Sequence, residues 1–164
     1  THTMRRICFA IVYLLLVPFL SAHANSDSTI SELLNSTTPP EGVVFEIITD
    51  DDDGLEWAIP RTQQYIKQLH EKFPQLAIAV VTHGREMFAL QKRDIYGYQD
   101  VHNQVQSLIQ DEKVSLHACG TYASWQGLAD EDFPAYVDVT ASGPATINDY
   151  VALGYVKIII EDED

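Results

Sequence analysis

Cysteine is scarce in this chain, whose 164 residues include only Cys8 and Cys119. Cys8 lies in an apolar N-terminal stretch, so loss of that stretch would leave a single thiol and no intramolecular disulfide. Thiol–disulfide exchange is then disfavoured, because it needs a second, resolving cysteine. The sequence also lacks zinc-type cysteine spacing, a phosphate-binding glycine loop and a Gly-x-Ser-x-Gly elbow. We therefore expect no metal and no cofactor, and attention falls on Cys119.

Basic residues are also few, with 10 Lys and Arg against 24 Asp and Glu and a net charge of -14. An acidic surface repels phosphate backbones, which argues against nucleic-acid binding. The charge fits either a cationic partner or a high-salt habitat. Four acidic residues, Asp50 to Asp53, form a loop that resembles a cation site. The loop fails the EF-hand spacing, since Thr49 and Pro60 stand where ligands are needed, so a helix-capping loop is favoured.

The N-terminal segment has the features of a secretory signal. Arg5 and Arg6 follow Met4, an apolar run extends over 7–20, and Ala22-His23-Ala24 provides a cleavage motif. We expect cleavage after Ala24, a periplasmic or secreted protein, and no membrane attachment afterwards. The alternative is an uncleaved anchor. Residues 1–3 are interpreted as an N-terminal scar or a misplaced start.

The remainder is expected to form one domain. Residues 25–41 are rich in Ser, Thr, Asn and Pro and predict a flexible tether or surface arm that could contain one short helical turn. Residues 42–164 are long enough for a single core and end in an acidic tail.

Hydrophobic patterns over 42–164 predict alternating strands and helices. The expected strands are 43–48, 76–81, 114–118, 137–140 and 155–160. The expected helices are 55–73, 98–110, 122–128 and 147–153. This alternation predicts an α/β three-layer sandwich, with a five-stranded, mostly parallel sheet and helices on both faces.

Ligand sites in such sheets form beyond the carboxyl ends of the strands. The loops that leave those ends are 49–54, 82–84, 119–121 and 141–144, all with glycine or small polar residues. We therefore expect a thiol, an imidazole and the acidic loop to share one crevice.

Cys119 lies where a strand is expected to turn into a helix. Free N–H groups at a helix start favour a thiolate, which could attack a polarised sulfur and hold it as a persulfide. Carboxylates from 50–53 would oppose this effect if they face the thiol. The alternative is a small buried hydrophobic residue, a common state of free cysteine.

The histidines are assigned different roles. His83 could orient a substrate or pair with the thiolate, or could equally cap the end of its strand. His117 lies two residues before the cysteine, on the same face, and is interpreted more readily as a hydrogen-bonded core histidine. His70 and His102 are expected on solvated helix surfaces. The aromatic residues Tyr96, Tyr98, Tyr122 and Trp125 could wall a pocket or form an oligomer surface.

Three segments resemble the DsrE/DsrF-like sulfur-relay family, in particular its exported members. They are Val80-Val81-Thr82-His83-Gly84, His117-Ala118-Cys119-Gly120-Thr121 and Leu153-Gly154-Tyr155-Val156-Lys157-Ile158. The likeness covers about 43–160 in order and spacing. It implies a compact α/β fold, trimers or hexamers, and a cysteine that accepts and passes on sulfane sulfur, a role that only Cys119 can take. His83, Gly84, Gly120, Thr121 and His117 occupy motif positions as supporting or substrate-binding residues.

Two functional hypotheses follow. The first is a periplasmic sulfur carrier or sulfurtransferase that holds a persulfide on Cys119, with sulfane-sulfur donor and acceptor proteins as partners. The second is a non-catalytic subunit that binds a small ligand or assembles with a periplasmic redox complex. An accessible Cys119 favours the first hypothesis, and a thiol sealed under Trp125 and Tyr122 favours the second.

Overall fold

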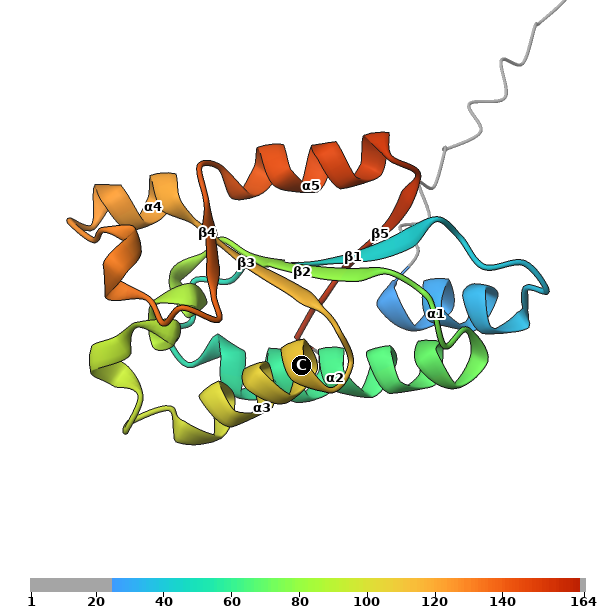
Figure 1. The fold of residues 1–164 in the computed structure, drawn as a ribbon, viewed down its shortest axis with the longest axis horizontal. Helices are drawn as coiled ribbons and strands as arrows, with labels where there is room; N and C mark the ends of the chain where they lie inside the picture. The colour runs from blue at the N-terminus through green and yellow to red at the C-terminus, as the bar shows by residue number, and fades with distance from the viewer. Residues whose placement is uncertain (1–24, 163–164) are drawn as a thin grey trace, which may run out of the picture.

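The computed structural model describes residues 25–162 (Figure 1). The predicted signal peptide and its cleavage motif lie outside the described residues, as do the last two residues of the acidic tail. No helix within 25–162 is long and apolar enough to cross a membrane.

Five strands and five α-helices make up most of this region. The strands are β1 (Gly42–Ile47), β2 (Ile78–Thr82), β3 (Ser115–Cys119), β4 (Asp138–Thr140) and β5 (Tyr155–Ile159). The α-helices are α1 (Ser26–Asn35), α2 (Gly54–Lys72), α3 (Gln99–Gln110), α4 (Gly120–Trp125) and α5 (Gly143–Ala152). Short 3-10 helices, which the sequence analysis did not predict, are η1 (Arg85–Leu90), η2 (Lys92–Asp94) and η3 (Asp130–Asp132).

The strands form one sheet in the order β4-β3-β2-β1-β5. All four neighbouring pairs are parallel, so the sheet is fully parallel where the prediction had been mostly parallel. Helices cover both faces, with α1, α2 and α3 on one side and α5 on the other (Figure 1). The predicted three-layer α/β fold is confirmed.

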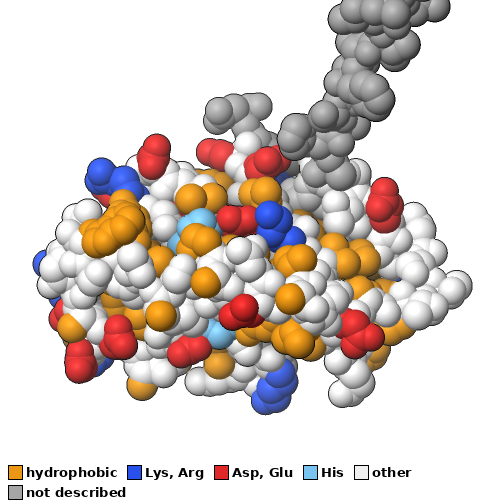
Figure 2. Space-filling view, turned by 90° about the horizontal axis from the view of Figure 1, so that it is seen from above, with side chains coloured by type: hydrophobic (Ala, Val, Ile, Leu, Met, Phe, Trp, Pro, Cys, Tyr) orange, Lys and Arg blue, Asp and Glu red, His pale blue; other side chains and the backbone are white. Residues whose placement is uncertain are grey.

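The two faces of the sheet differ in composition. The face under α2 and α3 carries the main apolar core, including Phe45, Val80 and Leu116. The face under α5 has a much smaller apolar cluster, formed by Val44, Ala79, Val81 and Ile147. In Figure 2, which views the molecule from the α5 side, histidine, acidic and basic side chains lie among the apolar ones.

The expected flexible arm is wrong for residues 26–35, which form helix α1. Asn25 caps this helix, since its side-chain oxygen accepts a hydrogen bond from the Ser28 N–H at 2.8 Å. Ile30 is buried, and the Tyr65 hydroxyl donates to the Asp27 carboxylate. The polar composition that predicted an arm in fact belongs to a capped helix whose few apolar side chains, Ile30, Leu33 and Leu34, pack in or against the core.

Helix α5 begins four residues before its predicted start. Ser142 is its N-cap, with a hydroxyl that accepts from the Ala145 N–H at 3.3 Å, and Pro144 lies in the first turn. Proline and glycine had been assigned to a loop, although proline is well tolerated in the first turn of a helix. This earlier start brings the helix end to the site described below.

His70 and His102 are not solvated as expected. His102 is only 1% exposed, and its ring nitrogens contact the Tyr136 hydroxyl and, at 2.9 Å, the Ala89 carbonyl oxygen. His70 is partly buried and contacts the Glu112 carboxylate at 2.6 Å. A histidine can be buried without a large free-energy cost when both of its ring nitrogens have hydrogen-bond partners. The helical pattern of the sequence does not reveal those partners, so the burial of His70 and His102 was not predicted.

Candidate functional site

A pocket of about 370 Å³ lies at the carboxyl edge of the sheet. All four predicted loops contribute to it. The loop after β1 supplies Ile48 and Asp50, and the segment from the end of β2 to the start of η1 supplies His83, Gly84 and Arg85. The end of β3 supplies Cys119, helix α4 supplies Thr121, Tyr122 and Trp125, and the start of α5 supplies Ser142 and Pro144. The structure therefore brings Cys119, His83, Gly84 and Thr121 together, while Gly120 and His117 lie outside the pocket lining.

Cys119 is the last residue of β3 and the N-cap of α4. Its thiol is free, and the residue is only 5% exposed, yet it lines the pocket. Trp125 is 75% exposed, so this ring flanks the pocket and does not seal the thiol beneath a buried cover. Cys119 is thus a nearly buried residue in the wall of the pocket.

His83 is held by a carboxylate that the sequence analysis did not single out. Its Nε2 atom lies 2.9 Å from Oε1 of Glu46, and the other carboxylate oxygen of Glu46 lies 3.7 Å from Nζ of Lys157. The hydrogen bond with His83 is the main cause of a lowered Glu46 pKa. Burial opposes this shift, whereas the charges of His83 and Lys157 lower the pKa further. An ionised carboxylate only accepts hydrogen bonds, so Nε2 donates, and in the neutral form of the ring Nδ1 would be the nitrogen that accepts a proton.

One sequence signal could have identified Glu46. It is the single charged residue in an otherwise apolar strand, Gly42–Ile47. A carboxylate is rarely placed in such a strand without a partner, because burial of an unpaired charge is costly. Its partner could not be named without the sheet register, in which Glu46 lies opposite Val81, two residues before the histidine.

Gly143 allows the start of α5 to approach both reactive side chains. A Cβ atom at this position would lie 2.8 Å from Cβ of His83 and 3.2 Å from Cβ of Cys119. Any larger residue would therefore displace the helix end or one of these two residues. Both residues therefore lie against the start of α5, at the ends of the adjacent strands β2 and β3.

A second buried carboxylate holds the ends of β1 and β2. Glu86 is fully buried and accepts hydrogen bonds from the Thr49 N–H at 2.9 Å, the Gly84 N–H at 2.9 Å and the Thr82 hydroxyl at 2.7 Å. A Cβ atom at Gly84 would lie 2.3 Å from the Glu86 carboxylate. Gly84 is thus required for this packing, and Glu86 positions the two loops that carry Ile48 and His83.

His117 and Gly120 have structural contacts. The Nδ1 atom of His117 lies 2.7 Å from the Asp138 carboxylate, and Nε2 lies 2.8 Å from the Tyr150 hydroxyl. Burial raises the pKa of Tyr150. Both ring nitrogens of His117 are therefore satisfied, as the core-histidine interpretation predicted. A Cβ atom at Gly120 would lie 2.7 Å from the Thr140 carbonyl oxygen, so this glycine lets the β3–α4 turn pack on β4.

The acidic loop is occupied by contacts with protein groups. Asp52 binds Arg85 through two hydrogen bonds of 2.9 and 2.8 Å, and this pairing lowers the Asp52 pKa. Asp53 accepts a 2.6 Å hydrogen bond from Tyr98, which raises the tyrosine pKa to about 12. Asp53 is the N-cap residue of α2, although its side chain makes no capping hydrogen bond. Within residues 25–162, no group of three or more His, Cys, Asp or Glu side chains is arranged to hold a metal ion.

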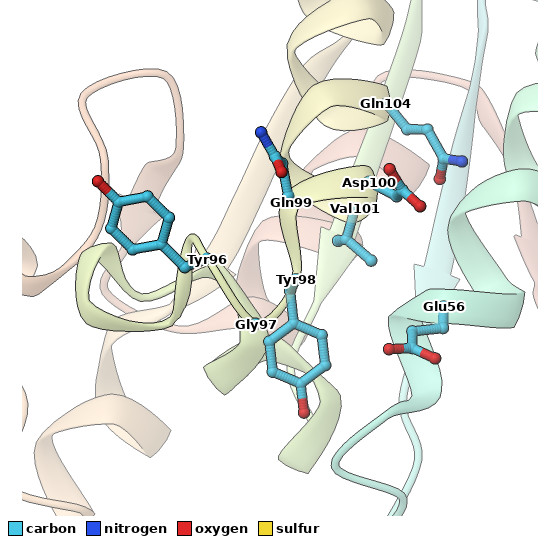
Figure 3. A pocket seen from close by; sticks show the side chains of 8 residues that line it. All are labelled: Glu56, Tyr96, Gly97, Tyr98, Gln99, Asp100, Val101 and Gln104. Carbon is cyan, nitrogen blue, oxygen red and sulfur yellow. The ribbon is translucent and has the colours of Figure 1, made fainter.

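The four aromatic residues noted in the sequence divide between two pockets. Tyr122 and Trp125 line the Cys119 pocket, whereas Tyr96 and Tyr98 line a separate pocket of about 430 Å³ beside α2 and α3. In Figure 3, Glu56 from α2 lies across from Asp100 and Gln104 of α3, and the Tyr96 ring points away from them. This second pocket is polar and acidic, and its lining contains no cysteine or histidine.

Comparison with known proteins finds the same fold in several solved structures, of which the first two described here are of proteins of unknown function. MTH1491 from Methanobacterium thermoautotrophicum is 24% identical and has a TM-score of 0.58, over 71% of this chain and 96% of that one. BT1422 from Bacteroides thetaiotaomicron is 12% identical (TM-score 0.51, 73% of this chain and 95% of that one). The ychN protein from E. coli is 10% identical (TM-score 0.51, 72% of this chain and 98% of that one). No protein-family model and no curated protein matches the chain. These likenesses establish the fold class.

Proposed function

We propose that this protein is a sulfur carrier or sulfurtransferase that holds sulfane sulfur as a persulfide on Cys119. The observation that carries the proposal is a free thiol that lines a pocket next to His83, whose ring is oriented by the Glu46 carboxylate. A nucleophile, a base and a group that orients the base form a common arrangement for activating a nucleophile. The resemblance to the DsrE/DsrF-like family, which we propose this chain belongs to, points to the same chemistry.

The proposed reaction conserves electrons without an external oxidant. His83 takes the thiol proton, and the Cys119 thiolate attacks the outer sulfur of a donor that contains a sulfur–sulfur bond. A new bond forms between the Cys119 sulfur and the transferred sulfur, the donor bond breaks, and the donor leaves with the electron pair. An acceptor thiolate then attacks the transferred sulfur and releases Cys119.

Glu46 has a positioning role in this scheme. Because it accepts a hydrogen bond from Nε2, it selects the tautomer in which Nδ1 accepts a proton, and it stabilises the charged ring that results. We propose that the protein acts in the periplasm after signal cleavage, with donor and acceptor proteins as partners. We also propose that it works as a trimer or hexamer, which sedimentation at micromolar concentration would detect as the absence of a dominant monomer.

Intact-mass measurement tests the chemical proposal. Protein purified without reductant is incubated with inorganic polysulfide, and we expect a mass increase in units of one sulfur that reductant reverses. Cys119→Ser is nearly isosteric and should abolish the adduct while preserving the fold. The proposal is wrong if the native protein takes up no sulfur and its thiol reacts with an alkylating reagent only after unfolding.

The low exposure of Cys119 supports a second candidate, a non-catalytic subunit that binds a small ligand in the same pocket. In that case the pocket would bind an apolar compound whether or not Cys119 is present. Equal binding by Cys119→Ser and the unchanged protein, together with no sulfur uptake, would support this candidate.

A further inference from the structure

We infer that the Cys119 pocket selects sulfur donors with an apolar or aromatic group and a low charge, in preference to small dianions such as thiosulfate. This inference rests on the proposed function and concerns the class of donor. The pocket has apolar walls, and the cationic side chains in and near it are already paired with carboxylates. Both features favour donors that carry an apolar group and little charge.

The walls of the pocket provide apolar contact area. Ile48 is 53% exposed and Trp125 is 75% exposed, and both line the pocket together with Tyr122 and Pro144. The Tyr122 and Trp125 rings lie 6.2 Å apart at 79°, in an edge-to-face arrangement. Large exposed apolar side chains around a concavity are typical of a ligand site, because a bound apolar group removes them from water.

The charges around the pocket disfavour dianions. Arg85 is the one Lys or Arg in the lining, and its guanidinium is paired with Asp52 through two hydrogen bonds. Lys157, which is outside the pocket lining on the same face of the sheet, is also paired, since its Nζ lies 3.7 Å from Glu46. Asp50 adds a carboxylate to the lining itself. A dianion would meet an Arg85 whose charge is already offset by Asp52, and it would approach the Asp50 carboxylate, and both features oppose its binding.

Three sulfur donors separate the effect of charge from that of the apolar group. Thiosulfate carries two charges and no organic group, methanethiosulfonate carries one charge and a methyl group, and benzenethiosulfonate carries one charge and a phenyl ring. In each case the Cys119 thiolate takes the outer sulfur, and sulfite or the sulfinate leaves with the electrons of the broken bond. Mass spectrometry measures the rate of persulfide formation, divided by the rate for free N-acetylcysteine to remove differences in intrinsic reactivity.

We expect benzenethiosulfonate to react fastest and thiosulfate slowest, with roughly a tenfold step for the ring, as is typical when an apolar pocket discriminates by size. Trp125→Ala should reduce the ring effect, whereas Tyr96→Ala, which removes an exposed ring outside this pocket, should not. Asp52→Asn releases Arg85 and should raise the thiosulfate rate relative to methanethiosulfonate.

Equal normalised rates for the three donors, or a preference for thiosulfate, would overturn the inference while leaving the persulfide proposal in place. The inference would also be wrong if neither Trp125→Ala nor Asp52→Asn changed the relative rates of persulfide formation for the three donors. Failure of all three donors to load Cys119, in contrast, would contradict the proposed function itself.

Discussion

The two faces of the sheet serve different purposes, although they share the same strands. Alternate residues of β1 show the difference, because Phe45 packs in the large core under α2 and α3, while Glu46 faces α5 and binds His83. The first face is apolar and thick, and the second carries paired charges and histidines over a small apolar cluster. Stability is thus concentrated on one face, which leaves the other free to hold ionisable groups beside the pocket.

The largest effect is expected on the apolar face. Phe45→Ala removes a fully buried ring that stacks on Tyr65 at 6.3 Å. Replacement of buried aromatic residues by alanine typically costs about 3–5 kcal/mol in the free energy of unfolding. Urea denaturation followed by circular dichroism measures this loss. A cost below about 1 kcal/mol would show that the core can collapse around the cavity, and would weaken the division between the faces.

Glu86→Gln tests the carboxylate that joins the ends of β1 and β2. An amide can accept through one oxygen only, so at least one of the three donors now bound by Glu86 would lose its partner. We expect a loss of about 1–3 kcal/mol in unfolding free energy. Glu56→Gln, an exposed change on α2, is the matched control. Equal denaturation midpoints for the two variants would contradict the structural role of Glu86.

Glu46→Gln removes one charge from the α5 face. The Glu46 pKa is lowered in the folded protein, so its ionised form contributes stability above the ordinary carboxyl pKa of 4.5, and this contribution is lost as the pH falls through the folded value. At neutral pH we expect the variant to be less stable by about 1 kcal/mol, with the gap closing on acidification. Denaturation between pH 3 and pH 7 measures this gap. A gap that is constant with pH would show that the charge of Glu46 is not involved.

The smallest effect on stability is expected at the exposed pair of Asp52 and Arg85. The two side chains are 61% and 52% exposed, and exposed ion pairs contribute little because water and salt screen them. Asp52→Asn should leave the thermal midpoint unchanged within error, even though we expect it to alter donor selectivity. A clear drop in midpoint at low and high salt alike would indicate that this pair holds the β1–α2 loop in place.

Much of the site could be predicted from the sequence because it depends on topology. Parallel strands bring their carboxyl ends to one edge, so Cys119 and His83 were expected together from the order of elements alone. Glu46, Glu86 and Gly143 were missed, since their importance depends on which backbone atoms or side chains lie against them. The same reason explains the errors at His102 and α1, where contacts with a distant tyrosine and with the apolar core decide burial.

By itself, the sequence determined the alternation of strands and helices, the parallel sheet, the scarcity of thiols and the strongly acidic surface, because each follows from local patterns or composition. Only the tertiary structure decided which side of each strand is apolar, that Glu46 orients His83, and that Arg85 is already paired. These features arise from contacts between residues far apart in the chain, such as Glu46 and His83, whose geometry is set when the whole sheet is assembled.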